Sequence, residues 1–198
     1  IFLRGKNAGA RHRPYCLKGA GCALHSCPET RVDGAPGGAG QSLYLPGFVA
    51  EARPPLGAPL SFIQRVFEVM ASTPRHTYQI LTKRAERLAE LDRHLHWTKN
   101  VWMGVSVESQ QYWDRVAYLR KTNAYTKVLS LEPLLGPLDL DDLSAVDWVI
   151  VRGESGPSAR MMREYWVRSI RDACVRSDVA FHFKQWGGPV KSLTGRIL

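Results

Sequence analysis

Five short apolar runs, each rich in β-branched or aromatic residues, recur along the chain from residue 77 onward and constrain its fold more than any other feature. Their starts are separated by about 21 to 32 residues, which is the length of a repeating strand–helix unit. Runs of this length and composition are typical of buried β-strands. The predicted strands are 77–82, 101–107, 126–131, 147–151 and 179–184.

Helical patterns, with apolar residues three and four positions apart, lie before and between these strands. Strands that are apolar on both faces and alternate with helices favour a parallel sheet covered by helices. The sequence therefore predicts an α/β domain over 59–198, either an α/β layer or part of a (β/α) barrel. We expect a loop over 132–146 and a core position for Cys174. The helical patterns cover 62–70, 88–95, 112–119 and 161–177.

Residues 1–58 differ in character from the rest of the chain. They hold ten of the 17 glycines and six of the 12 prolines and show no sustained period, so we predict an irregular segment with a boundary near residue 58. One hypothesis is that this segment is an unrelated fusion or the translation of a GC-rich region in another frame. The domain would then lack the first strands of a barrel.

Polar and charged residues follow each predicted strand. In a parallel sheet the carboxyl ends of the strands meet at one edge, where ligands commonly bind. Carboxylates there accept hydrogen bonds from amino and hydroxyl groups, and Lys and Arg bind a carboxylate or phosphate, so the edge suits a polar, charged cofactor. The candidate cofactor-binding residues are Thr82, Lys83, Arg84, Ser106, Glu108, Glu132, Gly153, Glu154, Ser155, Lys184, Gln185 and Trp186, the last as a stacking surface.

Five strings carry a family resemblance: QILTKR, VWMGVSVE, LSLEPLLGP, DWVIVRGESGPSAR and FHFKQWGG. In this order and spacing they resemble the phage gene-product thirty-seven/sixty-eight family, also called the three-Cys-motif proteins, over about 59–188. That family is similar to radical S-adenosylmethionine enzymes. The resemblance implies a partial (β/α) barrel, S-adenosylmethionine and a four-iron four-sulfur cluster as cofactors, and a partner protein encoded nearby.

If such a cofactor binds, the positions of Glu132 and Glu154 at the strand ends make them the best candidates to bind its amino or ribose groups. Ser106 and Glu108 would line the adjacent wall. The chain departs from the family at Arg152, which stands where the family has a glycine.

The cysteines that the resemblance implies as cluster ligands are Cys16, Cys22 and Cys27. Their C-x5-C-x4-C spacing differs from the C-x3-C-x2-C usual in the superfamily. Three interpretations stay open: ordinary thiols, a zinc or iron–sulfur site, or a disulfide pair.

Three functional classes follow. The first is a radical S-adenosylmethionine-like enzyme in a phage setting, and the second is a nucleic-acid-binding module, which the net charge of +9 favours. The third is an inactive remnant. No apolar run approaches the roughly 18 residues of a membrane-spanning helix, so we expect no membrane association and a cytoplasmic protein.

Overall fold

The computed structural model describes residues 58–190 and 194–198 in full. Before residue 58 it describes the backbone of three strands, namely β1 (Phe2–Leu3), β2 (Tyr15–Cys16) and β3 (Ser42–Pro46). Strands β1 and β2 pair as an antiparallel ribbon.

The centre of the fold is a six-stranded sheet in which each strand is parallel to its neighbours. The strands lie in the sheet in the order in which they occur along the chain, from β3 to β8. Five of them are the five strands that the sequence predicts, with ends that differ by one residue at most. Their bounds are β4 (Thr77–Thr82), β5 (Val101–Ser106), β6 (Thr126–Leu131), β7 (Trp148–Arg152) and β8 (Ala180–Gln185).

Helices precede β4 and connect most of the strands that follow it. Each has an apolar stripe: α1, for example, buries Ile63, Phe67 and Met70, which are spaced four and three residues apart. The 132–146 connection contains no helix, as the sequence predicts. The helices are α1 (Leu60–Ala71), α2 (Ala85–Leu91), α3 (Asp114–Arg120) and α4 (Glu164–Arg176), with 3-10 turns η2 (Asp92–His94) and η3 (Gln110–Tyr112).

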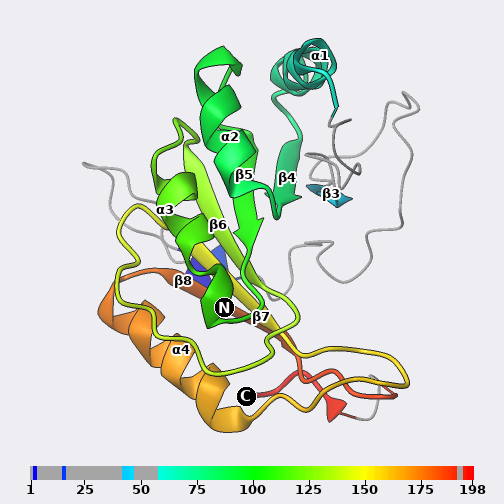
Figure 1. Cartoon of the computed structure of the whole chain (residues 1–198), viewed down its shortest axis with the longest axis vertical. Helices are drawn as coiled ribbons and strands as arrows, with labels where there is room; N and C mark the ends of the chain where they lie inside the picture. Colours follow the sequence, from blue (N-terminus) through cyan, green and yellow to red (C-terminus); the bar gives the residue numbers. More distant parts are fainter. Residues whose placement is uncertain (1, 4–14, 17–41, 47–57, 191–193) are drawn as a thin grey trace.

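The four helices among the described residues pack on one face of the sheet. Nearly all of their buried residues belong to one core cluster that also contains Val101, Leu129 and Val149 from three neighbouring strands. Figure 1 shows α2, α3 and α4 along the same side of the strands. This arrangement follows from the strand order, because right-handed connections between consecutive neighbours always return on the same side. The prediction of an α/β fold with a parallel sheet and covering helices is confirmed.

The second face of the sheet, opposite the helices, has its own small apolar cluster. Trp148 packs there with Val128 and Ala180, and its ring meets the edge of Trp102 at 5.7 Å between centroids. Gly104 lies on this face beside Leu81 and Val128, where an added Cβ would stand 2.5 Å from Leu81 Cδ2. The glycine therefore lets neighbouring side chains close over β5.

Strand β3 differs from the expectation that the first 58 residues contain no regular element. It runs parallel to β4, with Ser42 opposite Thr77 and Pro46 opposite Leu81. Its sequence, SLYLP, is only five residues long and lies in a glycine- and proline-rich stretch, so its alternation is too short to stand out.

Two further observations concern the described residues. Cys174 is fully buried, as predicted, and burial raises the pKa of its thiol to about 12. No helix among the described residues is long and apolar enough to cross a membrane.

Because β6 is a central strand, we expect Leu129→Ala to reduce the free energy of unfolding by about 2–5 kcal/mol. Leu129 is completely buried, and the truncation removes packed methyl groups and leaves a cavity. Urea unfolding followed by circular dichroism measures the change. Val175→Ala, at a position that is 71% exposed on α4, is the control and should change stability little. Equal losses in the two variants would contradict this account of the core.

Candidate functional site

The carboxyl ends of β4 to β8 form one edge of the sheet, and the sequence-predicted candidates lie along it. The first group centres on Glu108, just after β5. Its side chain is 7% exposed, with Oε1 2.7 Å from Lys83 Nζ and Oε2 3.1 Å from Arg115 Nη1. Arg115 also donates to the Ser106 carbonyl at 2.7 Å. Two cations thus neutralise this buried carboxylate.

The second group centres on Glu132, just after β6. Its side chain is 9% exposed, and Oε2 lies 3.6 Å from Lys184 Nζ, close enough for an ion pair but too far for a hydrogen bond. Oε1 is buried and has no hydrogen-bond partner. Since nearly all buried polar atoms are hydrogen-bonded in folded proteins, an orphan oxygen at a strand end needs an explanation.

Arg152, the last residue of β7, lies near Glu132 in the sheet order. The residues before them, Leu131 and Val151, pair across β6 and β7, and Glu132 follows the end of β6 directly. The side chains of Arg152 and Glu132 belong to the second face, because Trp148 and Ile150 of β7 and Val128 of β6 line that face. Arg152 Nε is buried without a hydrogen-bond partner. Glu132, Arg152 and Lys184, which we call the edge triad, thus present orphan or loosely paired charges.

Buried residues form the base beneath the edge triad. Ser130 is 2% exposed and precedes Glu132 by two positions on the same face. His182 is also buried, and its ring lies 6.1 Å from the Trp148 ring. The edge triad therefore lies above a well-packed layer of the second face.

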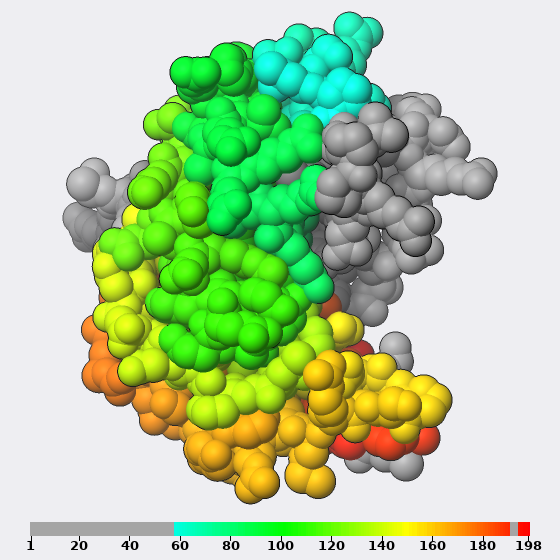
Figure 2. Space-filling view, viewed as in Figure 1, coloured from blue at the N-terminus to red at the C-terminus, as the bar shows by residue number. Residues whose placement is uncertain are grey.

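The loops that follow β7 and β8 are bound to each other. Gly153 N–H donates to the Gln185 carbonyl at 3.0 Å, and Gln185 Nε2 donates to Ser155 Oγ at 2.9 Å. A Cβ at Gly153 would stand 1.7 Å from the Trp186 carbonyl oxygen, so only glycine allows this approach. In Figure 2 the loop after β7 (yellow to orange) and the residues after β8 (red) project together.

Two other candidates in these loops already have partners. Glu154 accepts hydrogen bonds from the backbone N–H, Nε and Nη2 of Arg160, at 2.8–2.9 Å. These contacts lower the pKa of Glu154 from 4.5 to about 2. Trp186 packs edge-on against Phe183, a residue of the helix-side core, and its Nε1 donates to the Ile197 carbonyl. Both side chains thus have partners outside the edge triad.

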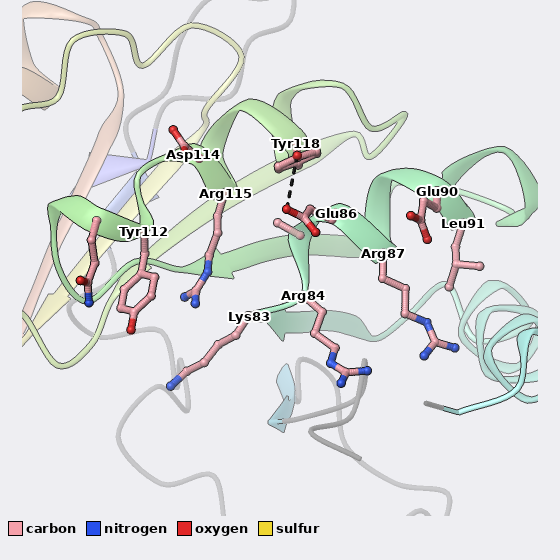
Figure 3. A pocket seen from close by; sticks show the side chains of 12 residues that line it. Lys83, Arg84, Glu86, Arg87, Glu90, Leu91, Tyr112, Asp114, Arg115 and Tyr118 are labelled. Atoms are coloured by element: carbon pink, nitrogen blue, oxygen red, sulfur yellow. Dashed lines mark hydrogen bonds between the residues drawn. The ribbon is translucent and has the colours of Figure 1, made fainter. Parts of the chain in front are cut away.

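Thr82 and Arg84 belong to the turn that starts α2. Thr82 is buried, and its Oγ1 accepts a hydrogen bond from Arg84 N–H at 3.0 Å, which fixes the turn. Beside this turn lies an open groove of about 810 Å³ between α2 and the η3–α3 segment (Figure 3). It is lined by Lys83 and Arg84, together with Arg87, Tyr112 and Arg115, three residues that are not among the predicted site residues.

The predicted metal ligands lie outside the described side chains. Cys16 is part of β2, whose backbone alone is described, and Cys22 and Cys27 fall in the undescribed ranges. Within the described ranges, no three His, Cys, Asp or Glu residues are grouped as metal ligands.

A comparison with known families matches residues 57–196 to the family described as "Protein of unknown function (DUF5131)". The chain belongs to this family. It is the phage gene-product thirty-seven/sixty-eight family that the five strings resemble. No curated protein and no solved structure matches the chain.

The family match includes every strand from β4 to β8 and all four helices. The groups around Glu108 and Glu132 therefore lie within the part of the chain that matches the family. Strands β1, β2 and β3 precede this part. The match begins within two residues of the boundary that composition predicts near residue 58.

We expect Gly153→Ala to destabilise the protein by several kcal/mol, about the range of strained or overpacked sites, because the new Cβ meets backbone that cannot rotate away. Gly136→Ala is the matched control, since a Cβ there meets nothing within 4 Å. Thermal unfolding compares the two variants with the parent. Equal melting temperatures for the Gly153→Ala and Gly136→Ala proteins would contradict the close contact between the two loops.

We expect Arg160→Gln to return the pKa of Glu154 from about 2 toward 4.5, because the variant removes the guanidinium hydrogen bonds. A lowered pKa means that the Glu154 contact stabilises the fold above pH 4.5 and loses this effect as the pH falls toward 2. Carboxyl NMR titration of Glu154 measures the change. Asp142, whose pKa is lowered chiefly by the Ser144 N–H, is the internal control and should not move. A Glu154 pKa that stays near 2 would exclude Arg160 as the cause.

Proposed function

We propose that the edge triad binds a small ligand with an amino or hydroxyl donor and an anionic group, and that this ligand is S-adenosylmethionine. The observation that carries the proposal is Glu132 Oε1, a carboxylate oxygen that is buried at the ligand-binding edge of a parallel sheet without a hydrogen-bond partner.

The neighbouring Glu108 strengthens this interpretation. It follows β5 as Glu132 follows β6, and the two side chains are buried to nearly the same degree. Glu108 Oε2 accepts a hydrogen bond from Arg115, and its Oε1, which has no hydrogen-bond partner, still lies 2.7 Å from Lys83 Nζ. Glu132 has one cation at 3.6 Å and no hydrogen bond to its buried Oε1. An ammonium or hydroxyl group of a ligand would give Glu132 the donor that the fold gives to Glu108.

The cations of the edge triad suit the other end of an amino-acid ligand. Lys184 is 40% exposed, so its ammonium group is accessible from solvent. Arg152 has a fork of donors that matches a carboxylate, and its buried Nε has no partner within the fold. An α-amino group on Glu132 and an α-carboxylate on Arg152 and Lys184 would place a methionyl group along the edge.

The family resemblance supports the choice of S-adenosylmethionine among amino-acid ligands and extends the proposal to a radical S-adenosylmethionine-like protein of phages. Bound there, the cofactor would supply an activated sulfonium group. The chain's own residues would bind and orient its polar ends. Glu154 would act at a distance from the ligand, because Arg160 holds it within its own loop.

We expect S-adenosylmethionine to raise the melting temperature of the parent protein, because a ligand that binds the folded state stabilises it by about 2.7 kcal/mol at a hundred times its Kd. Glu132→Gln keeps the shape of the side chain and removes its charge, so it should abolish most of this shift. Isothermal titration calorimetry gives the affinities directly.

Glu68→Gln is the matched control, because Glu68 is an exposed carboxylate on α1 far along the chain from the edge triad. Lys184→Met keeps the stem and removes the cation, so it should weaken S-adenosylmethionine but leave adenosine, which lacks a carboxylate, unaffected. A parent protein that does not bind S-adenosylmethionine, or a Glu132→Gln protein that binds it unchanged, would contradict the proposal.

A further inference from the structure

The groove between α2 and the η3–α3 segment is separate from the edge triad and has a charge pattern of its own. It begins at the end of β4, two strands from Glu132, and its volume is about 810 Å³. Four cations and three acidic residues line it. Whether the groove attracts anions therefore depends on where the positive and the negative side chains lie.

In Figure 3 Lys83, Arg84, Arg87 and Arg115 extend toward one side of the α2–α3 ribbon, and Asp114 lies on the other side. Glu86 lies between the two helices beside Tyr118, and Glu90 lies on α2 beside Leu91. Glu86 also accepts a hydrogen bond from the Tyr118 hydroxyl at 3.4 Å. One side of the groove is thus a row of cations.

Lys83 and Arg87 keep N–H donors for a ligand. Lys83 lies within hydrogen-bonding distance of Glu108 but has three N–H donors and is 48% exposed. Arg87 donates to the Ala58 carbonyl through Nη2, which leaves the other N–H groups of its guanidinium. Lys83 and Arg84 are adjacent, and Arg87 follows one helical turn later, so the row presents spaced positive charges suited to successive phosphates.

An aromatic ring completes the groove. Tyr112 is 37% exposed, and the Arg115 guanidinium carbon lies 4.1 Å from its ring centroid. Arg115 is itself held by Glu108 and the Ser106 carbonyl. The ring is therefore fixed in place by a buried ion pair while part of it stays accessible.

From this combination we infer that the groove binds single-stranded nucleic acid. Lys83, Arg84 and Arg87 contact consecutive phosphates, and a base stacks on Tyr112. A cationic row beside an accessible aromatic ring suits unpaired bases, because a duplex keeps its bases stacked on one another. The inference is independent of ligand binding at the edge triad.

The test measures fluorescence anisotropy of a labelled oligodeoxynucleotide of mixed sequence, about 20 nucleotides long, between about 50 and 200 mM salt. Each phosphate contact on a single strand contributes about 0.7 to the slope of log affinity against log salt. Lys83→Gln/Arg84→Gln should therefore reduce the slope by about 1.4 and weaken binding.

Arg168→Gln/Arg176→Gln is the matched control. It removes the same charge from the outer surface of α4, which packs against the β8 end of the sheet. The control should retain the parent's slope. Equal losses in the two double variants would show attraction by net charge alone and would overturn the inference.

A second pair of variants tests stacking. Tyr112→Ala should weaken single-strand binding about 5- to 150-fold with the slope unchanged, since stacking is not an ionic contact. Tyr125→Ala, at a position that is 59% exposed before β6, should have no effect. Unchanged binding by Tyr112→Ala, or a duplex bound as tightly as the single strand, would overturn the inference.

Discussion

The parallel pairing of each strand with the strand before it is the constraint on which the rest of the structure depends. Since every connection returns on the same side, one face of the sheet receives all four helices and the largest apolar cluster. The second face needs only the small layer around Trp148. The same constraint brings five strand ends to one edge, which is why residues as distant in sequence as Lys83 and Lys184 belong to one region.

Burial at that edge then determines which charges remain available. A buried carboxylate is costly unless cations or hydrogen-bond donors surround it. Glu108 meets this condition through Lys83 and Arg115, and this ion pair also positions the side chain that holds Tyr112. Glu132 does not meet it fully, with an oxygen that has no partner and Lys184 at 3.6 Å. Glu108 therefore organises protein structure, whereas the fold gives Glu132 fewer partners.

The strands and most helices were predictable because their apolar residues repeat with regular spacing, and the order of the strand-end residues followed from the parallel sheet. Strand β3 was not predictable, because its five residues lie among glycines and prolines and are too few to show a clear alternation of apolar residues. The contacts of individual side chains could not be predicted from the sequence either. Arg160 binds Glu154 only because the intervening loop turns back, and Trp186 faces the helix-side core although it follows a strand like the other candidates. Arg115 is a residue that spacing alone does not distinguish from any other helix-surface arginine.

These contacts show where part of the excess positive charge of the chain, which is +9 in total, lies. On the outer helix surfaces several arginines pair with a nearby acid, as Arg168 does with Glu164 and Arg171 with Asp172, so their charge is offset locally. At the sheet edge, Lys83 and Arg115 pair with Glu108 and Lys184 pairs with Glu132, so in these contacts three cations meet two acids. A local excess in a partly buried setting attracts anions more strongly than the same charge spread over solvated helices, because water and salt screen it less. Anionic ligands are therefore expected at this edge rather than over the surface as a whole.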